Sequence, residues 1–276
     1  MKTLKKIILV LLFIPLILSI VYSAIPTQVE TPNFNATHQV KFLTYNIHFG
    51  VGMDDQLNLE RIVQNILREN PDIIGLEEVE QGRITTQGVD MARWIAQQLG
   101  MHYYYYPAIN EHAFGVALLS RYPILNVTAY NLPTIVWERV MVRGTIQLNS
   151  TFLIDVFVTH LGLEDDNTTA QVQFILSKTS EISRPKVLLG DFNLYDDTSQ
   201  IQNVSLWFND TAKDYLGVPG NTFPSWPGPD RRIDYIFATN FNTIINSTVI
   251  TDMLPHVYAA WEYGSDHLPV TTTLQY

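Results

Sequence analysis

The chain has 276 residues, a hydrophobic content of 46% and a formal net charge of −10. This length allows one large domain with a substantial core. The acidic balance argues against a protein that coats nucleic acid through a wide basic surface, although it does not exclude an enzyme that grips a few phosphates at a metal site. Cysteine is absent, which excludes disulfides, thiolate metal sites and a thiol nucleophile.

The N-terminal sequence predicts export. Lys2, Lys5 and Lys6 precede an apolar run that begins at residue 7, which is the layout of a signal peptide. Counted to residue 25, the run approaches the roughly 20 residues that span a bilayer. We therefore expect residues 1–25 to be a signal peptide or an N-terminal membrane anchor, and residues 26–39, polar and aperiodic, to be a tether. In both cases the rest of the chain lies outside the cytoplasm.

Asn-X-Ser/Thr triplets, the acceptor sequence for N-glycosylation, are frequent in this chain. Each one alone arises easily by chance, but together they suit an exported protein. We therefore expect an extracellular glycoprotein, or one held at the outer face of a membrane. The triplets begin at Asn35, Asn126, Asn149, Asn167, Asn203, Asn209 and Asn246.

Apolar periodicity predicts alternating strands and helices within a single domain, residues 40–276. Helical spacing predicts one helix from Leu59 that ends at Asn70-Pro71, one from Met91 that ends at Gly100, and one over 169–182. Many strands with few helices indicate two packed sheets flanked by helices. The predicted strands are 41–45, 72–76, 103–106, 115–119, 124–130, 141–148, 152–159, 186–189, 233–238 and 270–274.

Short polar clusters accompany several of these apolar runs, mostly at their ends. Because loops at strand ends are where rigid scaffolds place reactive side chains, we expect the clusters to converge on one cleft. Their carboxylates, amides and two imidazoles suit a hard divalent cation and a phosphate ester. The clusters are Thr44-Tyr45-Asn46-Ile47, Leu76-Glu77-Glu78-Val79, Thr159-His160-Leu161, Gly190-Asp191-Phe192-Asn193, Arg232-Ile233-Asp234-Tyr235-Ile236 and Gly264-Ser265-Asp266-His267-Leu268-Pro269.

The two acidic clusters have clear chemical uses. Glu78 follows a buried strand, where a carboxylate needs a partner, and a single placed carboxylate fits Mg²⁺; a solvated loop acid is the ordinary alternative. Strand alternation sends Glu77 to the opposite side.

Asp191 and Asn193 lie on one side of an extended segment, where they can activate a water and donate to a phosphoryl oxygen. A simple Asx turn is the alternative.

The histidines need partners to act. A lone histidine at a strand end, such as His160, is more often structural than catalytic. His267 follows Asp266 directly and precedes a core strand. Asp234 interrupts an apolar run and is a candidate to fix the tautomer of one of the two imidazoles.

In order and spacing, the clusters resemble the motif series of the endonuclease/exonuclease/phosphatase superfamily, over essentially residues 40–276. The resemblance implies an α/β (α+β) fold, a four-layer sandwich with two mixed β-sheets packed face to face and helices on the outside. It also implies a Mg²⁺-dependent phosphoester hydrolase, with Mn²⁺ as the alternative ion, that uses an aligned water. We infer no obligate protein partner and expect a monomer.

Roles carry over residue by residue. Glu78 would be the main metal ligand, with Asn46 and Asp266 close to the metal and the phosphate. Asp191 would align or activate the water, and Asn193 would bind the phosphoryl group. His160 and His267 would stabilise the developing charge and assist the leaving group, and Asp234 would orient an imidazole. The two strand arginines, Arg139 and Arg143, could bind phosphate, although a salt bridge within the protein is an equally good explanation for each.

Two departures bear on the substrate. Glu77 stands where the family usually has Gln, and we expect little consequence. His160 is present, as in deoxyribonuclease-I-like, sphingomyelinase-like and inositol-phosphatase-like members, whereas abasic-site endonucleases generally lack it. With export and an acidic surface, this argues against genomic DNA repair. We expect an exported phosphodiesterase for a lipid headgroup or inositol phosphate. A nuclease for extracellular DNA or RNA and a catalytically silent binding module are the alternatives. Residues 221–229 and 256–264 are expected to shape the pocket rim.

Overall fold

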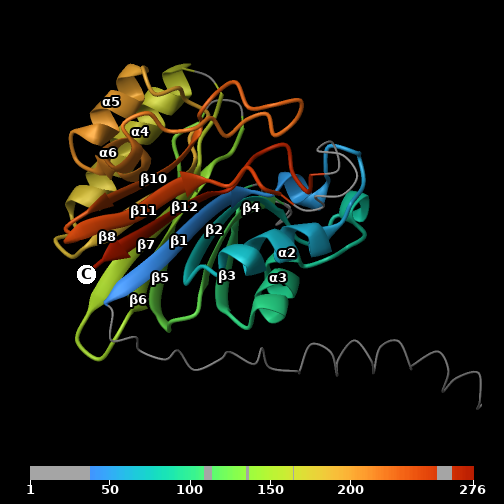
Figure 1. Ribbon diagram of the computed structural model, residues 1–276, viewed down its shortest axis with the longest axis horizontal. Helices are drawn as coiled ribbons and strands as arrows, with labels where there is room; N and C mark the ends of the chain where they lie inside the picture. The colour runs from blue at the N-terminus through green and yellow to red at the C-terminus, as the bar shows by residue number, and fades with distance from the viewer. Residues whose placement is uncertain (1–37, 109–113, 135–136, 164, 254–262) are drawn as a thin grey trace, which may run out of the picture.

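The computed structural model describes residues 38–108, 114–134, 137–163, 165–253 and 263–276 (Figure 1). Two six-stranded β-sheets pack face to face, and helices lie on the outside. This is the predicted four-layer sandwich. The predicted signal or anchor (1–25), nearly all of the tether and most of the second rim segment lie outside the described residues. Among the described residues, no helix has the length and apolar character needed to cross a membrane.

The first sheet has the strand order β11-β12-β1-β2-β4-β3, in which only β1 and β2 are paired in parallel. Helices α2 (Leu59–Glu69) and α3 (Met91–Leu99) pack on its outer face. Two short 3₁₀ turns, η1 (His48–Gly50) and η2 (Ile84–Thr86), follow β1 and β2. The strands are β1 (Gln39–Asn46), β2 (Ile73–Glu80), β3 (His102–Pro107), β4 (Phe114–Ser120), β11 (Thr243–Val249) and β12 (Val270–Gln275).

The second sheet has the order β5-β6-β7-β8-β10-β9, in which only β7 and β8 are parallel. Helices α4 (Asp165–Ser180) and α5 (Ser199–Ser205) pack on its outer face, and α6 (Thr211–Leu216) contacts β10 and β11. The strands are β5 (Ile124–Asn131), β6 (Val140–Gln147), β7 (Leu153–His160), β8 (Lys186–Asp191), β9 (Asn209–Asp210) and β10 (Asp234–Thr239).

Strand alternation builds the core. In β7, Val156 and Val158 face the other sheet, while Phe157 faces the helices, as the period of two requires. The two sheets are in close contact at Gly75 in β2, where an added Cβ would lie 2.0 Å from the side chain of Leu189. A larger residue at position 75 would therefore require the side chains packed across the sheets to shift.

The predicted helix ends at Asn70 and Gly100 are confirmed, since both residues cap helices in the left-handed conformation. Helix α4 begins at residue 165, four residues before the predicted start. Four further helices and strands were not predicted: α5, α6, the two-residue β9, and β11. The two helices have only seven and six residues, too few for a clear helical period. Strand β11 reads Thr-Ile-Ile-Asn-Ser-Thr-Val and lacks the apolar run that marks the other strands.

The topology brings the predicted clusters to one end of the sandwich. Strands β1 and β2 end there, as do β7 and β8, because the members of a parallel pair run in the same direction. The hydrogen bond from Asn46 to Asp191 shows that both pairs end on the same side. Strands β10 and β12 begin there, because each is antiparallel to its neighbour from that set. Six chain segments that are distant in the sequence therefore meet at one edge.

Arg143, predicted with Arg139 to contact phosphate, lies away from that edge. It lies inside β6 and donates to the fully buried Asp155 over 2.8 Å. Arg184 and Thr145 donate to the same carboxylate, each over 2.8 Å. Burial alone raises the pKa of Asp155, but these hydrogen bonds outweigh it and hold the pKa below its usual value. Arg143 therefore serves the folded state.

We expect Asp155→Asn to destabilise the protein by about 3 kcal/mol near neutral pH, because two arginines lose a buried charge partner. Because folding lowers the pKa of Asp155, its ionised carboxylate stabilises the folded protein at pH values above the unfolded-state pKa of about 3.9. This stabilisation is lost as the pH falls below that pKa. The stability gap between the two proteins should therefore narrow in acid. Thermal unfolding from pH 3 to 7 measures this; Asp252→Asn, at the exposed Arg68 ion pair, is the control. A gap that stays constant with pH would contradict the assignment.

Candidate active site

A β-bulge in β2 places the acidic pair. The predicted strand end at Leu76 is wrong: β2 continues to Glu80, with a register shift against β4 between Leu76 and Val79. Within the bulge the backbone of Glu78 has a φ of 55°, which is uncommon for a residue other than glycine. The bulge therefore rotates Glu78 out of the strand alternation and toward Asn46, whose amide nitrogen lies 3.2 Å from its carboxylate.

Asn46 joins the two sheets at the base of the site. Its Nδ2 donates to Glu78 of the first sheet and, over 2.9 Å, to Asp191 of the second. Its Oδ1 accepts from the backbone N–H of His48 over 3.0 Å. Asn46 thus positions two carboxylates, and its predicted contact with the metal stays a prediction.

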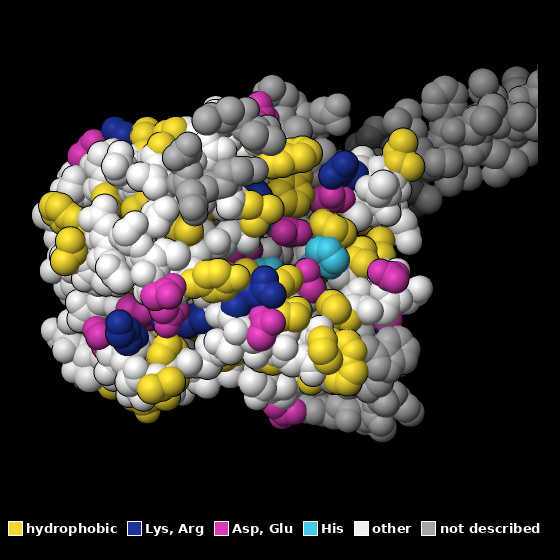
Figure 2. Space-filling view, turned by 90° about the horizontal axis from the view of Figure 1, so that it is seen from above, with side chains coloured by type: hydrophobic (Ala, Val, Ile, Leu, Met, Phe, Trp, Pro, Cys, Tyr) yellow, Lys and Arg dark blue, Asp and Glu magenta, His cyan; other side chains and the backbone are white. Residues whose placement is uncertain are grey.

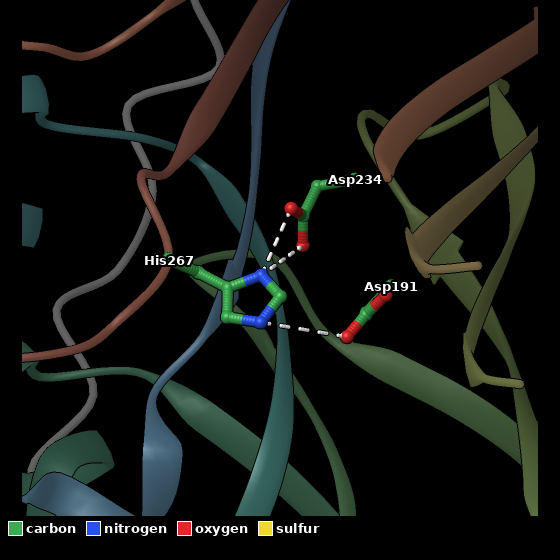
Figure 3. A group of neighbouring side chains, drawn as sticks. All are labelled: Asp191, Asp234 and His267. Carbon is green, nitrogen blue, oxygen red and sulfur yellow. Dashed lines mark hydrogen bonds and ion pairs between the residues drawn. The ribbon is translucent and has the colours of Figure 1, made fainter. Parts of the chain in front are cut away.

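Three side chains from the second half of the chain form a linear series, Asp234–His267–Asp191 (Figure 3). The Nδ1 atom of His267 lies 3.0 Å from Asp234, and its Nε2 lies 3.8 Å from Asp191. Gly190 makes the geometry possible, because with its φ of 147° an added Cβ would lie 1.9 Å from the carbonyl oxygen of Thr159. The predicted role of Asp234, to orient an imidazole, fits His267.

The two histidines have opposite electrostatic environments. Burial lowers the pKa of His267, but the carboxylates of Asp234 and Asp191 outweigh it and raise the pKa to about 10. Burial, reinforced by the positive charge of Arg139, lowers the pKa of His160 well below its usual value. Burial together with the charge of Asp234 raises the pKa of Asp191 to about 7. Near neutral pH the site therefore holds one imidazolium, one neutral imidazole and a carboxylate of moderate basicity.

His160 anchors the other side of the site. Arg139 places Nη1 3.1 Å from its Nδ1, and the side-chain amide of Asn193 lies 3.2 Å from its Nε2. Asn193 also donates to the carbonyl of Leu161 over 3.1 Å. Of the two strand arginines, Arg139 is thus the one that the fold brings to the predicted site.

Several site residues were not predicted as members. Glu77 is buried between the sheets, where it accepts from Thr44 over 3.0 Å. Burial, with the charges of Asp234 and Asp191, raises the pKa of Glu77 well above its usual value. It was missed because the bulge breaks the alternation that assigned it to the opposite side. His48 is also at the site, with Nδ1 3.9 Å from Asp266.

The donor set fits a divalent cation. Asp266 is partly exposed, and its charge, after burial, is among the influences that raise the pKa of Glu78. Asp191, Asp234 and His267 also present ligand atoms within 4.8 Å of one another, but His267 already bonds to Asp234. Glu78 and Asp266, the two carboxylates predicted to lie at the metal, could be stabilised by a hard cation, and their role as ligands stays a prediction. In Figure 2, histidine and acidic side chains gather in a hollow bordered by hydrophobic side chains.

Solved structures share this fold over most of the chain. The mannosyl-6-phosphatase Bt3783 from Bacteroides thetaiotaomicron matches with a TM-score of 0.73 at 19% identity, over 86% of this chain and 100% of the other. The catalytic domain of human Nocturnin, with a bound sulfate anion, matches with a TM-score of 0.67 at 20% identity, over 87% and 95%. The fold and the clustered side chains together define a member of the endonuclease/exonuclease/phosphatase superfamily.

The chain belongs to the family of the PGAP2IP C-terminal nuclease-like domain, whose model matches residues 37–210. Protein cwh43 from Schizosaccharomyces pombe is 31% identical over 149 residues, which are 53% of this chain and 15% of that protein. The chain thus spans only a small part of that relative's length. The predicted superfamily is confirmed.

The two arginines give separable predictions. We expect Arg139→Met to lower kcat/KM for a phosphodiester about 100-fold with little loss of stability, because Arg139 contacts His160 at the site. Arg143→Met should do the reverse, lowering the melting temperature while the folded fraction keeps its activity, because Arg143 pairs with Asp155. Steady-state kinetics and thermal unfolding of both variants test this. Equal losses of activity in the two folded variants would contradict the placement of Arg139.

Proposed function

We propose that this chain is an exported or membrane-tethered, Mg²⁺-dependent phosphodiesterase that hydrolyses a lipid headgroup. The observation that carries the proposal is the convergence of Glu78, Asp191 and His267 at one end of the sandwich, each held by a named partner. A silent binding module has no need for such a set, which favours catalysis.

Hydrolysis would use the site as follows. Asp191, with its raised pKa, accepts a proton from the attacking water, which Asn193 helps to orient beside it. His267, kept cationic by Asp234, stabilises the charge that develops on the phosphoryl oxygens. The bond from phosphorus to the leaving oxygen then breaks. A Mg²⁺ ion held by Glu78 and Asp266 would act as a Lewis acid on the phosphoryl group.

Exposed apolar side chains at the site end favour a lipid over a nucleic acid. Trp137 lies two residues before Arg139, and Tyr195 lies two residues after Asn193. Leu163, which lies three residues after His160, is also exposed. Trp and Tyr are the side chains that prefer the headgroup region of a bilayer.

Trp226 completes this group, which we call the apolar rim: Trp137, Leu163, Tyr195 and Trp226. It follows Ser225, whose backbone N–H donates to the carbonyl of Asp266 over 2.6 Å, so it lies beside the site. A nucleic-acid substrate would instead be served by basic side chains, and the chain carries a net charge of −10. The apolar run over residues 7–25 would hold the rim near a membrane.

We expect Glu78→Gln and Asp191→Asn each to lower kcat at least 100-fold, because the first removes a metal-binding charge and the second removes the base. Chelation with EDTA should abolish activity, and Mg²⁺ should restore it. The assay compares phospholipid and sphingolipid vesicles, inositol phosphates and plasmid DNA. Asp197→Asn, an exposed carboxylate on the same loop, is the matched control. Preferential cleavage of DNA would establish the nuclease instead, and no cleavage of any substrate would refute the enzyme.

The apolar rim generates a second prediction. Replacing Trp137 and Trp226 together with Ser should lower the hydrolysis of vesicle lipid about tenfold, because the rim loses its contact with the headgroup region. Hydrolysis of a small soluble phosphodiester should be unchanged. Trp207→Ser, an exposed tryptophan near the opposite end, is the control. An equal loss on both substrates would show that the tryptophans support the site itself and not a membrane contact.

A further inference from the structure

The sheets of this protein have four edge strands, and three of them carry an exposed asparagine within an Asn-X-Ser/Thr triplet. Asn126 lies on β5, Asn209 on β9 and Asn246 on β11. Seven of the 18 asparagines begin such a triplet, although Ser and Thr make up only 37 of the 276 residues. Composition alone predicts about two to three. From this placement, we propose that Asn126, Asn209 and Asn246 are N-glycosylated and that the glycans cover the open edges of the two sheets.

An open edge presents unpaired N–H and C=O groups that can pair with a second chain. Here each such edge also exposes a large apolar side chain next to the acceptor asparagine. Leu125, 55% exposed, precedes Asn126, and Ile245, 37% exposed, precedes Asn246. Two residues before Asn209, Trp207 is 57% exposed. These are sites at which an unmodified chain would associate with itself.

The backbone at two of these positions is suited to carry a bulky group. Strand β5 has a register shift between Ile124 and Asn126, and β11 has one between Ile244 and Asn246. A bulge bends an edge strand and turns the following side chain away from the ladder. The two asparagines therefore project from the edge, where a glycan meets no neighbouring strand.

The fourth edge, β3, has no triplet and is protected otherwise. Its six residues are all half-buried, its last residue is Pro107, and it contacts α3 and strands of the second sheet. Proline cannot donate to an added strand. The edge that the fold already covers is thus the one that lacks an acceptor.

The positions of Asn209 and Asn126 also leave the active site open. Asn209 pairs with Ala238, four residues along β10 from Asp234, or about 13 Å at the rise of an extended strand. Asn126 lies in the half of β5 that is remote from Arg139, because Asn131 at the end of β5 pairs with Val140. Glycans at these positions do not obstruct the apolar rim.

The modification needs only a donor that exported proteins meet, a lipid-linked oligosaccharide pyrophosphate. The amide nitrogen of the asparagine attacks C1 of the first sugar, so an N–C bond forms and the sugar–phosphate C–O bond breaks. The lipid pyrophosphate leaves, and the proton of the amide passes to a base of the transferase. In contrast, Asn167 is only 4% exposed within α4, and a glycan there has no room in the folded protein.

Peptide mass spectrometry of the full chain, purified from its native cells, tests the sites. We expect glycan masses on Asn126, Asn209 and Asn246 and an unmodified Asn167. Unmodified Asn126 and Asn246 would overturn the proposal, as would a glycan on Asn167 in soluble, folded protein. This result does not depend on catalysis, so it stands or falls apart from the proposed enzyme.

A hydroxyl deletion tests the role of the glycans while each asparagine stays in place. Thr128→Val with Thr248→Val removes two acceptor hydroxyls and keeps β-branched side chains on the strands. Asn131→Gln, on β5 but outside any triplet, is the control. We expect the double variant to lose two glycans and to aggregate several-fold faster by light scattering, with unchanged activity per folded monomer. Loss of the glycans without faster aggregation would refute the shielding of the edges.

Discussion

The burial of several carboxylates between two sheets is the constraint that shapes this end of the molecule. Asp191, Asp234 and Glu77 are each almost inaccessible to solvent, and unpaired charges in such a place cost several kcal/mol each. The protein offsets this cost in three ways: a cationic His267, a raised pKa at Glu77, and the amide of Asn46. A cation at Glu78 and Asp266 would offset more of it.

Asn46 has a particular place in this arrangement, because its amide is the direct polar link between the first sheet and Asp191 of the second. The link requires the two sheets to pack in one register. Gly75 permits that register by letting Leu189 approach the backbone of β2. A residue far from the chemistry thus helps to fix the distance between the metal-binding side and the base. Displacements of about 1 Å at such a site are costly for catalysis.

The sequence sufficed for the layers of the fold and for most of the site, because buried strands are marked by apolar runs and the polar clusters stand out against them. It was insufficient where geometry departs from the average. The bulge at Glu78 has no signature in Leu-Glu-Glu-Val, so the position of Glu77 was assigned from an alternation that the strand does not keep. Arg139 and Arg143 look equivalent in sequence, and only the end of β6 separates the arginine at His160 from the one at Asp155.

The exposed apolar side chains acquire a common explanation from the topology. Both sheets place a parallel pair at the centre, so their reactive strand ends face one way and their antiparallel neighbours leave open edges to the sides. Under the proposed function, apolar residues at the reactive end, such as Trp137 and Trp226, would contact a membrane. Those at the edges, such as Leu125 and Ile245, need a cover that leaves the reactive end free. A lipid surface at the reactive end and glycans along the sheet edges, as proposed above, would satisfy both requirements. Glycans at the reactive end would instead block the site.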